Sequence, residues 1–345
     1  MQILLVSSMY PGPNDPDFGV FVQQIVVELE RDGHTVDRAV VDERGRSLRK
    51  QLRLAKDALS RMRRGPDVVY AHYLFPAGAV GAVAAQLARA PLILTAHGRD
   101  VRNIATIRGV RSATRFAVTR ADTVIAVSDY LRRELVAKLP EVEGKVEVVS
   151  SGVDLDRFRN RDAGEARREV GWETEGPHVL FVGTLDERKN VIRLADAFDR
   201  LGYGSLAFVG DGPARSILEG GARVRVVGRV PHASVADWIA ASDVLCQPSL
   251  IEPFGQALLE AMASERSVVA TRVGGPPEFV TPEAGVLVDP VSVDSIVAGL
   301  ERALALPRPN RAARAEAAKH DVRTQAKRVA ALLERAITAA AGRAQ

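Results

Sequence analysis

The chain has 345 residues, of which 46% are hydrophobic and 26% charged, and its net charge is +4 at pH 7. This length is sufficient for two domains, and the composition is typical of a soluble globular protein. The modest charge and an aromatic content of 5% argue against a nucleic-acid partner, which would need a basic surface with stacking side chains.

A single cysteine, Cys246, excludes a disulfide within the chain and is expected to be a buried structural thiol in a reducing cytoplasm. The N-terminal residues MQILLVSSMYPG lack the basic region and the long apolar core of a signal peptide, so they are expected to begin the first strand. No apolar run approaches the ~20 residues of a transmembrane helix. We therefore expect a cytoplasmic protein.

Short β-branched runs alternate with amphipathic stretches along the chain, a pattern typical of parallel sheets covered by helices. The first series predicts strands at 3–7, 68–72, 92–97, 123–128 and 146–151 and helices at 20–31, 47–64, 77–89 and 129–139. After a polar, Gly-rich segment at 159–177, the second series predicts strands at 178–183, 205–210, 224–228, 243–249, 267–271 and 285–289. The Arg- and Ala-rich end of the chain, 308–343, is expected to be helical.

This alternation predicts an α/β fold with two Rossmann-like, doubly wound domains. We expect an N-terminal domain at 1–165 and a C-terminal domain at 166–321, with a helix at about 322–342 that packs back on the first domain. Ligands of such sheets bind beyond the carboxyl ends of the strands, so the two domains are expected to face each other across a cleft.

Two carboxylates accompany an apolar helix in the segment SLIEPFGQALLEAMAS, residues 249–264. If the helix begins near Phe254, Glu260 lies roughly 9 Å further along its axis. Glu252 and Glu260 would then lie on different faces and too far apart for a hydrolytic acid–base pair. The helix N-terminus between them favours an anion, and Gly255 lets a ligand approach the backbone. This layout suits a sugar nucleotide, with hydroxyls at both ends and phosphate in the middle.

The same segment resembles the hallmark of glycosyltransferase family 4, whose members are retaining enzymes with the GT-B fold. That hallmark is two Glu separated by seven residues in a segment like PSxxEPFGxxxxEAMA, and residues 248–263 read PSLIEPFGQALLEAMA. Other matching motifs are SSGVDLDRF at 150–158, FVGTL…RKN at 181–190, FVGDGP at 208–213, GRV at 228–230 and VGGPPEFV at 273–280. The resemblance extends over nearly the whole chain.

The resemblance implies roles for individual residues. Glu252 is expected to bind hydroxyls of the transferred sugar, and Glu260 those of the ribose. Arg188 and Lys189, after the first strand of the second domain, would grip the diphosphate and neutralise the leaving group. Further donor contacts are expected for Gly19, Arg229, Phe254 and Gly255.

On the first domain, His97 ends the strand of LILTAHGRD and matches a His that family members place near the reacting sugar carbon. With Arg188, Lys189 and Glu252 it completes the expected catalytic set. The acceptor-side candidates are Tyr10, His72 and Asp100. The chain departs from the family pattern at Thr184, where many relatives have Arg, at Asn190, where Gly is frequent, and at Gly19, which stands in place of a Gly-Gly pair.

Neither a metal nor a cofactor is expected. The sequences DPD at 15–17 and DLD at 154–156 mimic a metal-binding Asp-x-Asp, but the first lies in a Pro-rich loop and the second in a family motif. GDGP at 210–213 lacks the third Gly of a dinucleotide fingerprint. The expected small-molecule partner is a UDP- or GDP-linked sugar that serves as the donor substrate.

Residues 44–64 carry nine cations and one Asp, and one helical stripe contains Leu48, Leu52, Ala55, Leu59 and Met62. Such a helix either docks on its own domain or presents a basic surface to anionic membrane. The second alternative would place the protein peripherally at the inner face of the membrane, where a lipid-linked acceptor is found.

These features predict transfer of a sugar from a nucleotide donor to a hydroxyl of a glycan, a lipid-linked acceptor or a small molecule, with retention at the anomeric carbon. Glycan, glycolipid or polysaccharide biosynthesis is the expected setting. No residue stands out as a nucleophile, so the family implies a front-face displacement assisted by the leaving phosphate. Two alternatives stay open: a sugar-nucleotide 2-epimerase of the same fold, which needs no acceptor, and a catalytically silent sugar-nucleotide-binding subunit.

Overall fold

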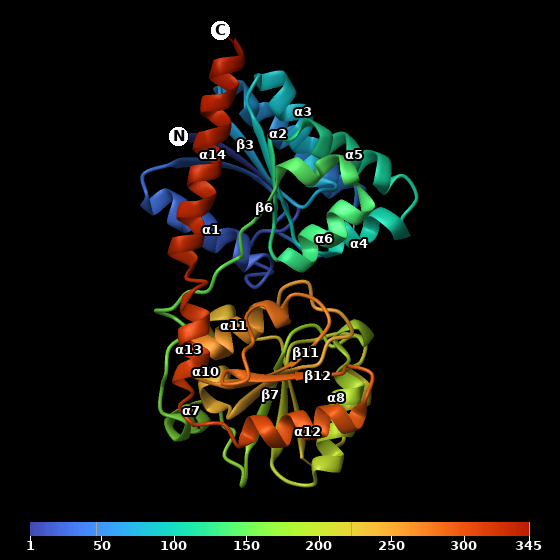
Figure 1. Ribbon diagram of the computed structural model, residues 1–345, viewed down its shortest axis with the longest axis vertical. Coiled ribbons are helices and arrows are strands. Elements are labelled where there is room, and N and C mark those ends of the chain that lie inside the picture. The colour runs from blue at the N-terminus through green and yellow to red at the C-terminus, as the bar shows by residue number, and fades with distance from the viewer. Residues whose placement is uncertain (46, 222, 345) are drawn as a thin grey trace. The chain divides into compact units, whose positions relative to one another are not determined.

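Two sheets of six parallel strands organise the chain, and each sheet is the centre of one α/β unit (Figure 1). The computed structural model describes residues 1–45, 47–221 and 223–344. The first unit contains Met1–Gly152 and the C-terminal helix α14 (Val322–Ala344), and the second contains Val153–Asp321. The predicted fold class of two Rossmann-like, doubly wound units is confirmed.

The first sheet has the strand order β2-β1-β3-β4-β5-β6. Its strands are β1 (Gln2–Ser7), β2 (Thr35–Val40), β3 (Val68–His72), β4 (Leu92–Ala96), β5 (Thr123–Ala126) and β6 (Val146–Val148). The other helices of this unit are α1 (Val20–Arg31), α2 (Leu48–Arg61), η1 (Met62–Arg64), α3 (Ala77–Ala88), α4 (Arg99–Thr106), α5 (Val110–Arg120), α6 (Asp129–Lys138) and η2 (Pro140–Lys145). Strands β3 and β4 are buried at every position, as expected at the centre of a sheet that is covered on both faces.

The sequence analysis did not predict β2, which is the edge strand beside β1. Its sequence TVDRAV has only two buried residues. Asp37 and Arg38 in its middle pair with Arg61 and Glu30, at 2.6 and 2.5 Å. An edge strand needs only one apolar face, so a search for continuous apolar runs misses it.

The helix expected at 47–64 is present as α2 and η1, but its predicted apolar stripe is not the face that docks. The buried residues of α2 are Leu54 and Ala58, whereas Leu48 and Leu52 are 76% and 61% exposed. Arg46, which belongs to the basic segment, lies outside the described residues. The two exposed leucines instead stand among cations on the outer surface of the first unit.

The second sheet has the strand order β12-β11-β10-β7-β8-β9. Its strands are β7 (His178–Val182), β8 (Ser205–Val209), β9 (Val224–Gly228), β10 (Val244–Gln247), β11 (Ser267–Thr271) and β12 (Gly285–Val288). The helices of this unit are α7 (Ala163–Glu169), η3 (Glu187–Lys189), α8 (Val191–Leu201), α9 (Arg215–Leu218), α10 (His232–Ala241), α11 (Gln256–Ala263), η4 (Pro276–Glu278), α12 (Val293–Leu304) and α13 (Arg311–Ala318). All six strands fall at the predicted places.

Helix α14 completes the core of the first unit, although it lies far from that unit in sequence. It packs in the same core cluster as α1, through residues at the spacing of one helical face: Val322, Ala326, Val329, Leu333 and Ala336. Where α14 starts, the chain approaches itself closely. A Cβ on Gly152, whose φ is +77°, would lie 2.6 Å from the Cα of Val322. This is the helix that the sequence places at about 322–342.

The units divide after Gly152, whereas the sequence analysis placed the boundary after residue 165. Residues 153–165 pack with the second unit through polar contacts. Arg161 pairs with Asp237 on α10 at 2.5 Å, and Arg266 donates to the main-chain oxygen of Arg161 at 2.9 Å. Such contacts leave no periodic pattern, so the sequence alone suggests a linker here.

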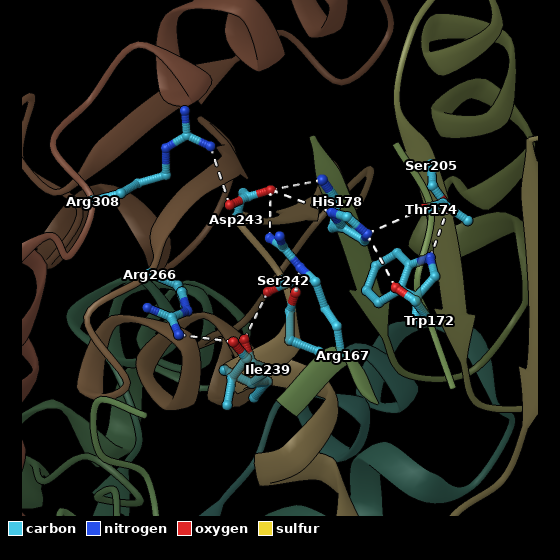
Figure 2. A network of polar contacts seen from close by, with 12 residues as sticks. Arg167, Trp172, Thr174, His178, Ser205, Ile239, Ser242, Asp243, Arg266 and Arg308 are labelled. Atoms are coloured by element: carbon cyan, nitrogen blue, oxygen red, sulfur yellow. Dashed lines mark hydrogen bonds and ion pairs between the residues drawn. The ribbon is translucent and has the colours of Figure 1, made fainter. Parts of the chain in front are cut away.

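A buried carboxylate fastens α7 to the strands of the second sheet (Figure 2). Asp243, just before β10, pairs with Arg167 at 2.9 Å and with Arg308 at 3.1 Å. It also accepts a bond from the main-chain N–H of His178 at 2.8 Å. Burial by itself would raise the pKa of Asp243, but His178 and the two guanidinium groups outweigh this effect and hold the pKa below its usual range. The cluster lies at the amino ends of β7 and β10, so it stabilises the fold rather than forming part of the candidate site.

Candidate active site

The loops that follow β7 and β10 are fastened together in the second unit. Asn190, directly after η3, has a left-handed backbone with φ +61°, which Asn tolerates better than most residues. Its side-chain amide donates to the main-chain oxygens of Pro248 and Pro290, at 2.9 and 2.6 Å. The N–H of Leu250 donates to the main-chain oxygen of Arg188 at 2.9 Å. The η3 turn is therefore held against the loop that carries Glu252.

Lys189 and Glu252, which are 63 residues apart in sequence, form an ion pair with an Nζ–Oε2 distance of 2.5 Å. Both side chains are largely buried, with 12% and 9% of their surface exposed. The hydroxyl of Ser249 donates to the same Oε2 atom at 3.0 Å. Among the residues that the structure describes, no group bonds to Oε1 of Glu252, so this atom keeps its capacity to accept hydrogen bonds.

The main chain of Glu252 is fixed by the loop after β11. Its N–H donates to the oxygen of Val273 at 3.1 Å, and its own oxygen accepts a bond from the N–H of Gly275 at 2.8 Å. Gly274, with φ +118°, lies so close that a Cβ there would be 2.0 Å from the Glu252 oxygen. Because only glycine fits this position, the VGGPPEFV motif at 273–280 serves to place Glu252.

Helix α11 begins at Gln256, two residues later than Phe254, where the sequence analysis expected it. Its N-cap is Gly255, which has φ +109° and makes no side-chain cap. A Cβ on Gly255 would be 2.8 Å from Cδ1 of Leu258, so the position requires glycine. The positive end of the helix dipole lies directly after the loop of Glu252 and favours an anion there.

Glu260 is buried in α11, with 5% of its side chain exposed, and among the described residues it has no Lys or Arg partner. Its Oε1 atom has two long contacts, 3.4 Å from Nε2 of His232 and 3.5 Å from Nε2 of Gln256. No described group bonds to Oε2. A buried carboxylate with so few partners is costly unless a ligand supplies donors, and ligand hydroxyls are suitable donors.

The remaining donor-side candidates differ in exposure. Arg188 is partly exposed, and its closest described carboxylate is that of Asp186, at 3.8 Å. Arg229 is exposed and directly follows β9. Phe254 is buried against Phe279, with the ring centroids 5.7 Å apart. The side chain of Arg188 is thus held only weakly, whereas Phe254 packs into the loop.

Two imidazole rings meet at the ends of β3 and β4 in the first unit. Nδ1 of His72 lies 3.0 Å from Nε2 of His97, and the stacked rings have centroids 5.3 Å apart. Burial lowers the pKa of His97 to about 3. Burial together with the neighbouring His97 lowers the pKa of His72 well below its ordinary value. Both rings are therefore neutral near pH 7 and share one hydrogen bond.

Aromatic side chains enclose this pair. The rings of Phe21 and Tyr73 lie 4.8 and 4.7 Å from that of His97, measured between centroids. Nε2 of His72 is buried without a hydrogen-bond partner among the described groups, beside a small cavity lined also by Tyr70 and Phe21. The surroundings explain why protonation of either imidazole is unfavourable.

Asp100 is 2% exposed, and its carboxylate binds main-chain N–H groups. Four of these groups donate to it over distances of 2.8 to 3.1 Å, those of Leu74, His97, Gly98 and Val101. Burial raises the pKa of Asp100, although these bonds oppose the shift. The side chain ties the loop after β4 to the loop after β3 and so fixes the position of His97. Its contact with an acceptor stays a prediction.

Gly19 and Tyr10 lie in the loop after β1. Gly19 is the N-cap of α1 with φ +78°, and a Cβ there would be 2.7 Å from the carbonyl carbon of Met9. Tyr10 is 8% exposed, and its hydroxyl accepts a bond from Nε of Arg38 at 3.1 Å. The loop is therefore closely packed at Gly19, with Tyr10 anchored by its hydroxyl.

The sequence analysis missed three neighbours of the predicted residues: Ser249, Tyr73 and His232. Ser249 could have been found, because a hydroxyl three residues before Glu252 is within reach of its carboxylate in a turn. Tyr73 has a left-handed backbone with φ +76°, which is uncommon for a bulky residue and leaves no trace in the sequence. His232 contacts Glu260 from another element, α10.

No three side chains of His, Cys, Asp or Glu come together as a metal site within the described part of the chain. Asp154 of the DLD sequence accepts bonds from the N–H groups of Asp156 and Arg157, both at 3.0 Å. Asp15 of the DPD sequence pairs with Arg44 at 3.1 Å. None of the helices in the described ranges is long and apolar enough to span a bilayer.

Two family profiles match the chain. The profile described as Glycosyltransferase Family 4 matches residues 18–157, and the profile described as Glycosyl transferases group 1 matches residues 162–321. The chain belongs to glycosyltransferase family 4. The resemblance inferred from the EPFG…E segment is confirmed, and the protein is a glycosyltransferase.

Known proteins agree with this family and fold. The chain is 29% identical over 351 residues to TuaC of Bacillus subtilis (strain 168), named as a glycosyltransferase of teichuronic acid biosynthesis, and the match covers 88% of this chain and 89% of TuaC. Among solved structures, a sucrose-phosphate synthase from Thermosynechococcus elongatus superposes with a TM-score of 0.81 at 20% identity, over 98% of this chain and 100% of that one. The Anabaena protein Alr3699/HepE, in complex with UDP-glucose, gives 0.75 at 21% identity, over 97% and 100%. The fold is GT-B.

Proposed function

We propose that this glycosyltransferase moves a sugar from a UDP- or GDP-linked donor to an acceptor hydroxyl, with retention at the anomeric carbon. The observation that carries the proposal is the buried Lys189–Glu252 pair directly before the N-terminus of α11, with the weakly partnered Glu260 in the same helix. From Glu252 to Glu260 the segment offers an acceptor atom, a helix N-terminus and a second carboxylate, and Lys189 adds a cation beside Glu252. A sugar, a diphosphate and a ribose present complementary groups in the same order.

Each side chain of the second unit has a role in this proposal. Oε1 of Glu252 binds hydroxyls of the transferred sugar, and Glu260 binds those of the ribose. Lys189 and Arg188 neutralise the diphosphate, which gains charge as the bond to the sugar breaks. The N-terminus of α11, opened by Gly255, adds main-chain donors. Arg229 and Phe254 are proposed as further contacts around the nucleotide.

In the first unit we propose His97 as the residue that contacts the reacting sugar. Because its imidazole is neutral near pH 7, it binds a sugar hydroxyl by a hydrogen bond without placing a second positive charge near the developing cation. Gly19 is proposed to contact the donor. Tyr10, His72 and Asp100 are proposed on the acceptor side, with Asp100 acting through the main chain of His97.

The named relatives support the substrate class. HepE was crystallised with UDP-glucose, which supports a nucleotide-sugar donor. The name of TuaC supports polysaccharide or glycan biosynthesis as the setting. The family implies a front-face displacement, and we propose that the leaving phosphate itself accepts the proton of the acceptor hydroxyl.

The decisive experiment begins with a thermal-shift screen over UDP- and GDP-linked sugars. The donor that stabilises the protein most is then incubated with candidate glycan, lipid-linked and small-molecule acceptors, and the anomeric configuration of the product is read by NMR. An axial donor linkage that becomes axial in the product supports retention. An inverted product refutes it, and an isomerised donor formed without acceptor would identify an epimerase instead.

The surface of α2 supports a peripheral contact with anionic membrane. Leu48 and Leu52 are exposed, and Arg49 and Lys56 nearby form no ion pair among the described residues. Several other cations of the segment are paired with carboxylates, for example Lys50 with Glu43 at 3.1 Å. Exposed leucines among free cations match an interface of anionic headgroups and acyl chains.

We expect the protein to float with vesicles that contain anionic lipid and not with neutral vesicles. The double substitution Leu48→Ser and Leu52→Ser should abolish this flotation. Equal recovery with both kinds of vesicle would refute this contact.

A further inference from the structure

The family motif SSGVDLDRF at 150–158 has no role in the donor site described so far. Residues 154–158, in the second unit, surround His232 at the start of α10. The carboxylate of Asp154 accepts bonds from the main-chain N–H groups of Asp156 and Arg157, each at 3.0 Å, and so fixes the turn. The buried ring of Phe158 meets that of His232 edge-on, with the centroids 5.7 Å apart. The motif thus holds the imidazole from two sides.

Arg157 determines where the proton of His232 lies. Its Nη1 atom is 2.8 Å from Nδ1 of His232. A guanidinium group donates hydrogen bonds and cannot accept them, so Nδ1 of His232 must be the acceptor. The ring then carries its proton on Nε2. That nitrogen is 3.4 Å from Oε1 of Glu260. Arg157 therefore donates to His232, and His232 donates to Glu260.

We propose that His232 is a positioning residue for the nucleotide part of the donor. Its Nε2–H restrains Oε1 of Glu260 and turns the carboxylate toward the ribose hydroxyls, while Arg157 fixes the tautomer that can donate. This inference rests on the proposed function, because the ribose contact of Glu260 is part of that proposal.

The charges around Glu260 explain why a neutral imidazole suits this role. Glu252 is held by the ammonium of Lys189, which neutralises it. Glu260 has no such cation among the described side chains, and its nearest donors are neutral. A neutral donor restrains the carboxylate without cancelling its charge, so the carboxylate remains a strong acceptor for hydroxyls.

The test compares two ligands and four variants by isothermal titration calorimetry. The ligands are UDP or GDP, whichever stabilises the protein, and the 2′,3′-dideoxy form of the same nucleotide. His232→Phe keeps an aromatic ring against Phe158 but removes the Nε2 donor. His232→Gln retains a hydrogen-bond donor. Arg157→Leu removes the guanidinium donor to Nδ1, so the proton of His232 is no longer confined to Nε2. Arg159→Leu is the matched control, since Arg159 is an exposed arginine of the same stretch.

We expect His232→Phe to weaken binding of the ribonucleotide by about threefold to tenfold, the range of one neutral hydrogen bond. Binding of the dideoxy nucleotide should not change, because it lacks the hydroxyls that Glu260 would bind. His232→Gln should recover most of the loss, Arg157→Leu should show a smaller loss of the same kind, and Arg159→Leu should match the wild type. Equal losses for both ligands would mean that His232 only supports the fold, and the inference would be overturned.

The ribonucleotide preferences of Glu260→Gln and His232→Phe separate this inference from the proposed function. If Glu260→Gln retains the full preference for the ribonucleotide, the ribose assignment fails, and the role of His232 fails with it. If Glu260→Gln loses that preference while His232→Phe retains it, only the role of His232 is overturned. Nitrogen NMR of the labelled imidazoles gives the tautomer directly. The Nε2–H form is expected in the wild type, and the Nδ1–H form would overturn the inference.

Discussion

The Lys189–Glu252 pair allows a quantitative test of the proposed donor site in the absence of any substrate. Lys189→Met leaves a carboxylate without its cation, and Glu252→Gln leaves an ammonium without its carboxylate. The double variant leaves neither charge unpaired. Because both side chains are largely buried, the two single variants should lose much more stability than their sizes suggest.

The expected magnitude follows from distance and burial. At 2.5 Å, Coulomb's law with an effective dielectric of about 20 gives an attraction of about 7 kcal/mol, and desolvation of both charges cancels part of it. Removing one partner of a buried pair typically costs about 3–5 kcal/mol. For a domain of this size about 1 kcal/mol corresponds to about 2–4 °C in melting temperature, so each single variant should melt at least about 6 °C lower.

Melting temperatures of the wild type, both single variants and the double variant form a double-mutant cycle. The double variant should lose clearly less than the sum of the single losses. Arg200→Met serves as a control, since Arg200 pairs with Asp294 at 2.8 Å but the two side chains are 60% and 89% exposed. It should cost less than about 1 kcal/mol. Additive losses at Lys189 and Glu252, or losses as small as that of the control, would refute the coupling derived from the structure.

Arg188→Ala should lower turnover on the order of 10²-fold, because Arg188 is proposed to neutralise the leaving diphosphate; steady-state rates at saturating donor that match the wild type would refute this role. Excess EDTA should leave activity largely intact, since the described residues form no metal-ligand group; a loss of activity that a divalent ion restores would contradict this. Stability should fall as the pH drops below about 6.5, because unfolded His72 and His97 take up protons that the folded rings, with their lowered pKa values, do not. Denaturation between pH 7 and pH 5 should show this slope, and His97→Asn should reduce it by up to about 1.4 kcal/mol per pH unit; an unchanged slope would argue against a neutral His97.

The two sheets could be predicted because a buried parallel strand leaves a simple trace in sequence. Every strand that is covered on both faces forms a short apolar run, and these runs occur at the predicted positions in both units. The apolar run is missing at β2, where one face is polar and Asp37 and Arg38 form ion pairs. It is also missing in residues 153–165, whose membership of the second unit depends on partners such as Asp237.

The candidate site could be predicted as a set of residues, but its geometry could not. The EPFG…E segment identifies Glu252 and Glu260, yet it gives no sign that Lys189 pairs with the first of them across 63 residues. That contact depends in part on the main-chain bond from Leu250 to Arg188, which any residue type could make. Backbone hydrogen bonds are independent of side-chain identity, so no sequence motif predicts them.

The different partners of the two carboxylates also predict a direction along α11 for the proposed donor. Glu252 is paired with a cation, so an incoming diphosphate meets no net negative charge there, and Lys189 can bind a phosphate oxygen while it still contacts the carboxylate. Glu260 has no such cation among the described side chains and would repel a phosphate. We therefore infer that the diphosphate lies at the start of the helix and the ribose one turn further along, at Glu260. The same unequal pairing would let one helix bind the proposed donor, a neutral sugar and a neutral ribose joined by a charged diphosphate, without bringing two anions together.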